Sequence, residues 1–199
     1  MRLSKGIITL LAFASVAMVG CGSGSSSKKS SSAASTAAGV TTNQTVNLTE
    51  ARAQHKAVLL QNGEIFIIGG TDAVNDPMAS TVIVTASSVR PGPDMSTARV
   101  GHSVTLLANG NVLVAGGQSD NPGFNVLDTT EIFDAATSTF SAGPTLAEAR
   151  AFHVSALYNT AAGEQIMLAG GRGAGTPTAA IPMPGAPLDS AEVLDVAAG

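Results

Sequence analysis

The 199-residue chain has no tryptophan, one tyrosine and one cysteine, and aromatic residues make up only 4% of it. A single cysteine excludes a disulfide within the chain and any metal site built from several thiolates. Charged residues are also scarce, at 12%, and the formal net charge is −4. Because the sequence contains no basic patch, nucleic acid is not an expected partner. The chain is instead rich in apolar residues, at 44%, and contains 22 glycines.

The N-terminus has the pattern of an export signal. Arg2 and Lys5 precede an apolar run over 7–19, which is too short to span a bilayer comfortably, and Met18-Val19-Gly20-Cys21 follows. We therefore predict a signal peptide over 1–20, and the sequence has no second long apolar stretch that would predict a transmembrane helix. Cys21, placed directly after the cut, resembles the lipobox of bacterial lipoproteins, although Met18 stands where leucine is usual. That resemblance implies lipidation of Cys21; the alternative is an ordinary secretion signal with an unused thiol.

A tether follows the signal. Residues 21–44 are rich in serine, alanine and glycine and contain almost nothing large and apolar. Such a segment cannot bury enough apolar surface to offset the entropy of ordering it. We expect it to hold a folded region, 45–199, away from a membrane in the bacterial cell envelope, at the outer membrane or the cell surface.

One pattern recurs three times in the folded region. It reads Arg-x-x-His, an apolar strand, a turn, and a second apolar strand that ends in Gly-Gly. His102 follows His55 by 47 residues, and His153 follows His102 by 51. A period near 50 predicts four-stranded units stacked as the blades of a β-propeller. The repeated residues, all predicted to be structural, are Arg52, His55, Gly69, Gly70, Arg99, His102, Gly116, Gly117, Arg150, His153, Gly170 and Gly171.

The predicted fold is all-β, since helical periodicity is missing from the repeats. Asn62-Gly63 and Asn109-Gly110 predict type I′ hairpins, and the third unit has a longer turn over 159–163. Expected strands cover 57–60, 64–68, 81–85 and 88–90; then 103–107, 111–115, 130–134 and 139–141; then 154–158, 165–169 and 191–195.

We place the unit boundaries at 45–95, 96–143 and 144–199. Residues 45–52 align with the end of the second unit and predict a lone fourth strand, whereas the third unit stops after its third strand. Three units are too few to close a propeller, which needs about four to eight. We therefore expect an open, incomplete ring whose outer faces further blades or other chains would cover.

These motifs resemble the kelch repeat over about 45–199, in its galactose-oxidase-like form. The copper-radical oxidases of that branch use a cysteine cross-linked to a tyrosine, a second tyrosine and two histidines. This chain has only Tyr158 and Cys21, so it cannot assemble that site alone. The tryptophan usual in the fourth strand is also missing; Phe140 takes its place once, and Val89 does so in the first unit.

The repeated polar residues allow two interpretations each. His55, His102 and His153 could bind a metal, or each could bond the backbone of its own unit. Recurrence favours the structural role, with the same environment in each unit and a cost of about 1 kcal/mol for His102→Ala. The arginines could form a cationic ring for an acidic ligand, or pair with repeat carboxylates such as Glu131 and Glu192; recurrence again favours structure.

Loops after the di-glycines hold most other polar groups. A calcium site there would use oxygen ligands, but neither of the first two loops fits EF-hand spacing, and the same residues are ordinary in turns. The third loop, 172–190, is long and proline-rich. We predict no catalytic residue, cofactor or metal. The calcium candidates are Asp72, Asn75 and Asp76 in the first loop and Asp120, Asn121, Asn125 and Asp128 in the second.

The expected function is non-catalytic binding of a protein or glycan in the cell envelope, on the face that carries the loops after the di-glycines. An alternative is part of a carbohydrate-active or oxidase-like propeller enzyme whose catalytic residues lie outside this chain. A third reading is a purely structural or adhesive surface protein. Propellers carry many unrelated functions, so the architecture does not choose among these.

Overall fold

The computed structural model describes residues 47–119, 125–161, 163–175 and 185–195. Cys21, the tether and the residues of the expected lone fourth strand before Asn47 lie outside these ranges. Within them, no helix has the length and apolar character needed to cross a membrane.

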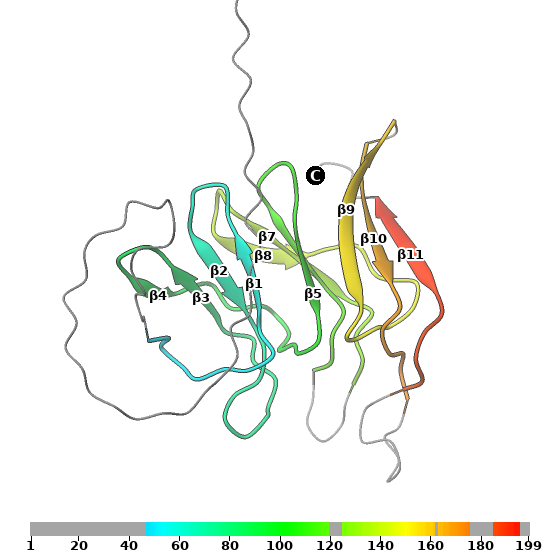
Figure 1. Cartoon of the computed structure of the whole chain (residues 1–199), viewed down its shortest axis with the longest axis horizontal. Helices are drawn as coiled ribbons and strands as arrows, with labels where there is room; N and C mark the ends of the chain where they lie inside the picture. The colour runs from blue at the N-terminus through cyan, green and yellow to red at the C-terminus, as the bar shows by residue number, and fades with distance from the viewer. Residues whose placement is uncertain (1–46, 120–124, 162, 176–184, 196–199) are drawn as a thin grey trace, which may run out of the picture. The chain divides into compact units, whose positions relative to one another are not determined.

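The described residues form eleven strands in three antiparallel sheets, and none of the sheets closes on itself (Figure 1). The fold is therefore all-β with open propeller-like blades, as predicted. The first sheet is β1 (Lys56–Leu59), β2 (Ile65–Ile68), β3 (Thr81–Val84) and β4 (Val89–Pro91). The second is β5 (Ser103–Leu106), β6 (Val112–Ala115), β7 (Thr130–Asp134) and β8 (Thr139–Ala142). The third is β9 (Val154–Thr160), β10 (Gly163–Ala169) and β11 (Ala191–Asp195).

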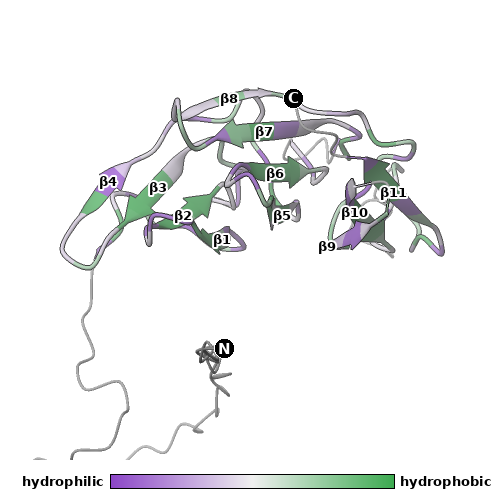
Figure 2. Cartoon of the chain, turned by 90° about the horizontal axis from the view of Figure 1, so that it is seen from above, coloured by the Kyte–Doolittle hydropathy of each residue, from purple (hydrophilic) through white to green (hydrophobic). Residues whose placement is uncertain are grey.

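The sheets follow one another in chain order around their first strands. Strand β1 lies beside β5, and β5 lies beside β9. Figure 2 shows these three strands along one side of the sheets, with β4 and β8 on the opposite side. Among the described strands, none of the first sheet contacts one of the third, so the second sheet separates them as expected for an open ring.

The hairpin turns differ from the prediction. A type I′ turn needs positive φ at both central residues, but only the glycines have it, Gly63 at +85° and Gly110 at +90°. Each loop is a three-residue turn that ends in a left-handed glycine, because an asparagine side chain accepts a backbone N–H two residues later. Asn62 Oδ1 accepts from Glu64 and Asn109 Oδ1 from Asn111, both at 3.0 Å.

The turn of the third unit is shorter than the expected 159–163. Strand β9 continues through Thr160, which pairs with Gly163 at the start of β10. The reason is that the antiparallel ladder extends to this end, with Asn159 opposite Glu164. The expected loop residues are therefore largely strand.

The apolar core lies between sheets. Because successive strand residues point to opposite faces, the second sheet packs one set of its side chains against the first sheet and the other set against the third. Three phenylalanines join the first two sheets, with ring centroids 4.4 Å apart for Phe66–Phe133 and 5.4 Å for Phe133–Phe140. The second and third sheets share a cluster that includes Leu113, Ile166 and Leu168.

Candidate functional site

The repeated arginine is a buried connector between strands. Arg99 Nε and Nη2 donate to Glu131 Oε1 at 3.2 and 2.9 Å, and Nη1 donates to the carbonyls of Gly116 and Thr129, both at 2.9 Å. The side chains of Arg99 and Glu131 are 1% and 4% exposed. Burial lowers the pKa of Arg99, and the adjacent carboxylate of Glu131 opposes that shift. The guanidinium thus holds the ends of β6 and β7 together.

Each repeated arginine lies near a carboxylate, but the carboxylate does not come from the same repeat position in all three units. Arg150 Nε donates to Glu192 at 2.9 Å, and its Nη2 lies 3.6 Å from Glu148. Arg52 lies 3.5 Å from Glu50 instead, since β3 carries no carboxylate. The expected pairs with Glu131 and Glu192 are present. All three guanidinium side chains are at most 1% exposed, so no described arginine of the repeat faces an acidic ligand.

The histidines cross from one sheet to the next. His102 is fully buried, and a Cβ atom on Gly69 of the first sheet would lie 3.0 Å from its Cε1 atom. His153 stands in the same way against Gly116 of the second sheet, also at 3.0 Å. A ring fills the space that a glycine leaves, so truncation of His102 would cost packing. Neither ring nitrogen of His102 has a hydrogen-bond partner among the described residues, so the cost does not come from the single hydrogen bond expected from sequence.

The expectation of one shared histidine environment is wrong. His153 Nε2 lies 2.9 Å from Ser103 Oγ of the preceding sheet. His102 cannot repeat this bond because Lys56 stands at the matching position before it. The difference arises because each histidine contacts a neighbouring sheet, where the sequence of the repeat varies.

The buried histidines predict loss of stability in acid. Burial is the main cause that lowers the pKa of His102 to about 3 and that of His153 to about 4, whereas an unfolded histidine titrates near about 6.5. The unfolded state therefore binds protons that the folded state does not, so stability is full above about pH 6.5 and falls as the pH decreases. We expect each histidine to contribute up to about 1.4 kcal/mol per pH unit of this loss.

Urea unfolding midpoints at pH 7, 5.5 and 4.5 would measure this effect. A His102→Asn chain cannot titrate at this position and should lose less stability between pH 7 and 4.5 than the parent. Parallel loss in both chains would show that His102 does not contribute.

A turn with a left-handed residue precedes each repeated histidine. The residue before it has positive φ in all three units: +53° at Gln54, +67° at Gly101 and +58° at Phe152. A bulky residue rarely adopts this conformation. Phe152 is held by its N–H, which donates to the carbonyl of Gly101 at 2.6 Å, and its ring lies over that glycine. No sequence signal marked this turn.

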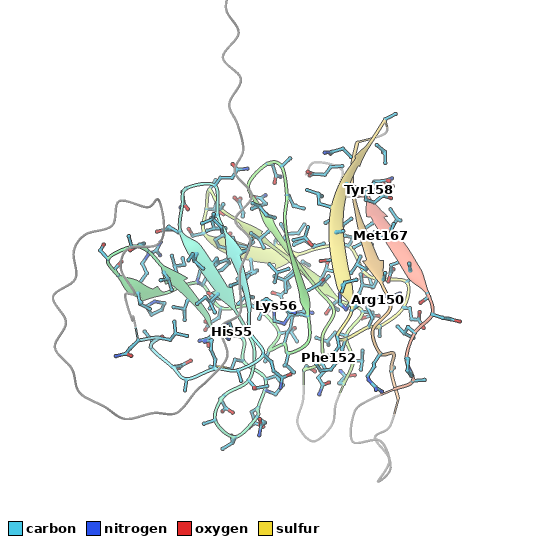
Figure 3. All side chains as sticks on the ribbon, viewed as in Figure 1. His55, Lys56, Arg150, Phe152, Tyr158 and Met167 are labelled. Atoms are coloured by element: carbon cyan, nitrogen blue, oxygen red, sulfur yellow. The ribbon has the colours of Figure 1, made fainter. Side chains whose placement is uncertain are left out.

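The first residues of β1, β5 and β9 surround a shallow depression of about 220 Å³. Figure 3 shows Lys56 on β1, the strand beside β5. Its polar residues are Lys56, Ser103, His153 and Ser155. Ser103 Oγ lies 2.9 Å from His153 Nε2, and Ser155 Oγ lies 2.7 Å from Thr105 Oγ1, so each hydroxyl also has a partner in the fold. Of these residues, the sequence marks only His153, which belongs to the repeat. The residue after each repeated histidine differs among the units, and Lys56, Ser103 and Ser155 become neighbours only in the fold.

The Asp72 carboxylate has a local role in the first loop. Asp72 Oδ1 accepts the N–H groups of Val74 and Asp76, both at 2.9 Å, which closes a turn. Asp120 and Asn121 lie outside the described residues. Over the described ranges, no group of three or more His, Cys, Asp or Glu side chains is placed to hold a metal ion.

The comparisons with known proteins assign no family. No protein-family model matches the sequence, and no curated protein matches it. The described residues form an all-β fold of three open antiparallel sheets with four, four and three strands.

Proposed function

We propose that this chain is a kelch-type blade protein that is exported, lipid-anchored at Cys21 in the bacterial cell envelope, and acts as a non-catalytic binding scaffold. The kelch assignment is supported by three copies of Arg-x-x-His and Gly-Gly, each placed at the matching points of a sheet. The anchor rests on the leader pattern alone.

The observation that carries the binding role is the depression at the ends of β1, β5 and β9. It brings Lys56 together with Ser103 and Ser155, and His153 is neutral at pH 7 because burial lowers its pKa to about 4. Hydroxyls both donate and accept hydrogen bonds, and lysine supplies three donors with a positive charge. This set fits a hydroxyl-rich ligand that carries a carboxylate, so we propose an acidic glycan.

Short bridges fix the loops that leave the same end of the sheets. Thr71 pairs with both Ala53 and Pro77, and Gln118 pairs in the same way with Val100 and Val126. The first bridge of each pair binds the segment before a first strand to the segment after a di-glycine, and the second closes the loop that follows the di-glycine. The variable loops therefore start from a rigid base, which suits recognition by loops on a scaffold.

Glycan-array retention of the full chain tests this proposal, with neutral oligosaccharides and uronic-acid-containing oligosaccharides as probes. We expect retention on the acidic probes and a loss of at least about tenfold in affinity for Lys56→Ala, close to the value of one charge-assisted hydrogen bond. Arg90→Ala is the matched control, since Arg90 is an exposed cation on β4 that pairs with Glu64.

Equal retention of the Lys56→Ala and Arg90→Ala chains would contradict a role for the depression. No retention on any glycan would contradict the glycan assignment. The intact mass of the membrane-extracted chain reports the anchor separately: a mature form that begins at Cys21 with added acyl mass is expected, and Cys21→Ser should lack it.

A further inference from the structure

The joint between neighbouring sheets is built the same way twice. Two backbone hydrogen bonds close it: the Gly117 N–H donates to the Arg150 carbonyl at 2.9 Å, and the Arg150 N–H donates to the Leu127 carbonyl at 3.1 Å. The second residue of the di-glycine and the repeated arginine thus bind across the joint. The first joint has the same two bonds, from Gly70 to Arg99 at 3.0 Å and from Arg99 to Met78 at 3.1 Å.

The third sheet carries the di-glycine half of such a joint, and no described residue binds to it. Leu188 corresponds to Leu127, because its N–H also donates to the second glycine of its own unit, Gly171, at 2.9 Å. Among the described residues, the Gly171 N–H and the Leu188 carbonyl have no hydrogen-bond partner. A Cβ atom on Gly170 would meet only a carbonyl oxygen 3.8 Å away, whereas one on Gly116 would meet the Arg150 carbonyl at 2.3 Å.

The first sheet carries the other half of a joint, the segment with the repeated arginine. The guanidinium of Arg52 is bound within its own sheet, to the carbonyls of Gly69 and Ser80. Its backbone N–H and carbonyl make no hydrogen bond within the described residues, although both groups are bonded in Arg99 and Arg150. A hollow of about 230 Å³ lies beside Arg52, lined also by Ala51, Ala53, Asp72 and Ala73.

Apolar side chains accompany both halves. On the open face of the third sheet, Val154, Met167 and Val193 are 69%, 42% and 47% exposed. On the opposite face of the first sheet, Leu59 and Ile65 are 62% and 43% exposed. The same repeat positions are covered inside the chain, since Leu113 matches Met167 at 1% exposure and Val112 matches Ile65 at 0%.

We propose that these two ends bind each other between two copies of this chain, head to tail. The Gly171 N–H would donate to the Arg52 carbonyl of the second copy, the Arg52 N–H to the Leu188 carbonyl, and the His55 ring would fill the space over Gly170. The described residues carry both halves, so a second copy of this chain offers each end its matching partner. Two copies of three sheets make six blades, within the usual range for a closed propeller, and closure stops such a contact from growing into a filament.

Disulfide cross-linking tests this contact. Thr105 Oγ1 and Ser155 Oγ lie 2.7 Å apart across the second joint, and Ala156 and Ala57 hold the matching positions of the proposed one. We expect a full chain with Cys21→Ser, Ala57→Cys and Ala156→Cys to form a covalent dimer when oxidised glutathione takes up the two electrons and two protons. Each single cysteine should give at least about tenfold less dimer, because a head-to-tail contact pairs unlike positions.

Two matched pairs of variants separate loss of the contact from misfolding of the chain. In the double-cysteine chain, Gly170→Ala should abolish the dimer, while Gly163→Ala, a positive-φ glycine with open space around it, should keep it. Met167→Glu should also block it, while Val74→Glu on a loop should not. Absence of a dimer in the double-cysteine chain would overturn the proposal. So would equal dimer from a single cysteine, or a dimer that survives both Gly170→Ala and Met167→Glu.

Discussion

Replacing Arg99 with alanine is expected to destabilise the fold by about 3–5 kcal/mol, the cost of breaking a buried ion pair from one side. The substitution leaves the Glu131 carboxylate buried at 4% side-chain exposure. It also removes the donor that serves the carbonyls of Gly116 and Thr129. An unpaired buried charge and unpaired carbonyls add their desolvation costs.

Arg90→Ala is the matched control for this prediction. Arg90 also bonds a carboxylate, Glu64, at 3.0 Å, but its side chain is 51% exposed. An exposed pair of this kind is worth at most about 1 kcal/mol. Urea unfolding of both variants at pH 7 measures the difference. If Arg99→Ala costs no more than Arg90→Ala, the buried connector does not stabilise the sheets.

Replacing Gly116 with alanine is expected to destabilise the chain by about 2–5 kcal/mol. Part of this cost is the positive φ of +60°, which is worth about 1–2 kcal/mol for a residue with a Cβ atom. The rest is the clash across the joint, since the new Cβ would lie 2.3 Å from the Arg150 carbonyl and 3.0 Å from the His153 ring. Backbone cannot move aside as a flexible side chain can, so overpacking of about 1–3 kcal/mol is added.

Gly170→Ala separates the two costs. Gly170 has nearly the same φ, +65°, but none of the described sheets lies beyond it. It should lose only the backbone part, about 1–2 kcal/mol. Urea unfolding at low protein concentration, where contacts between copies are broken, measures both variants. An equal loss of stability in both variants would show that the joint tolerates a Cβ atom. The di-glycine would then serve only the positive φ at the strand end.

The strands of the fold were predictable because their signals are local. Apolar runs such as 65–68 and 112–115 end at Gly-Gly, and the structure forms β2 and β6 there. The positive φ of both glycines is also a local requirement, since strand ends of this form need residues without a Cβ atom. The open arrangement followed from the number of repeats.

The hairpin type was predicted wrongly because two local signals compete. Asn-Gly permits a type I′ turn, but the Asn62 side chain captures the N–H of Glu64 and the asparagine keeps a negative φ. The choice between these turns depends on one side-chain hydrogen bond and on the strand register around it, which the dipeptide alone does not encode.

By itself, the sequence predicted an all-β chain of three repeats with structural arginines and glycines, because a repeated motif places the same chemistry at the same point of each unit. Only the tertiary structure decided what lies across the joints. The contacts of His102 with Gly69 and of His153 with Ser103 join residues of neighbouring sheets, and Lys56 and Ser155 line one depression although the described strands that carry them do not contact each other. Such contacts depend on how one sheet packs against the next, and the period of the repeat fixes their order but not their geometry.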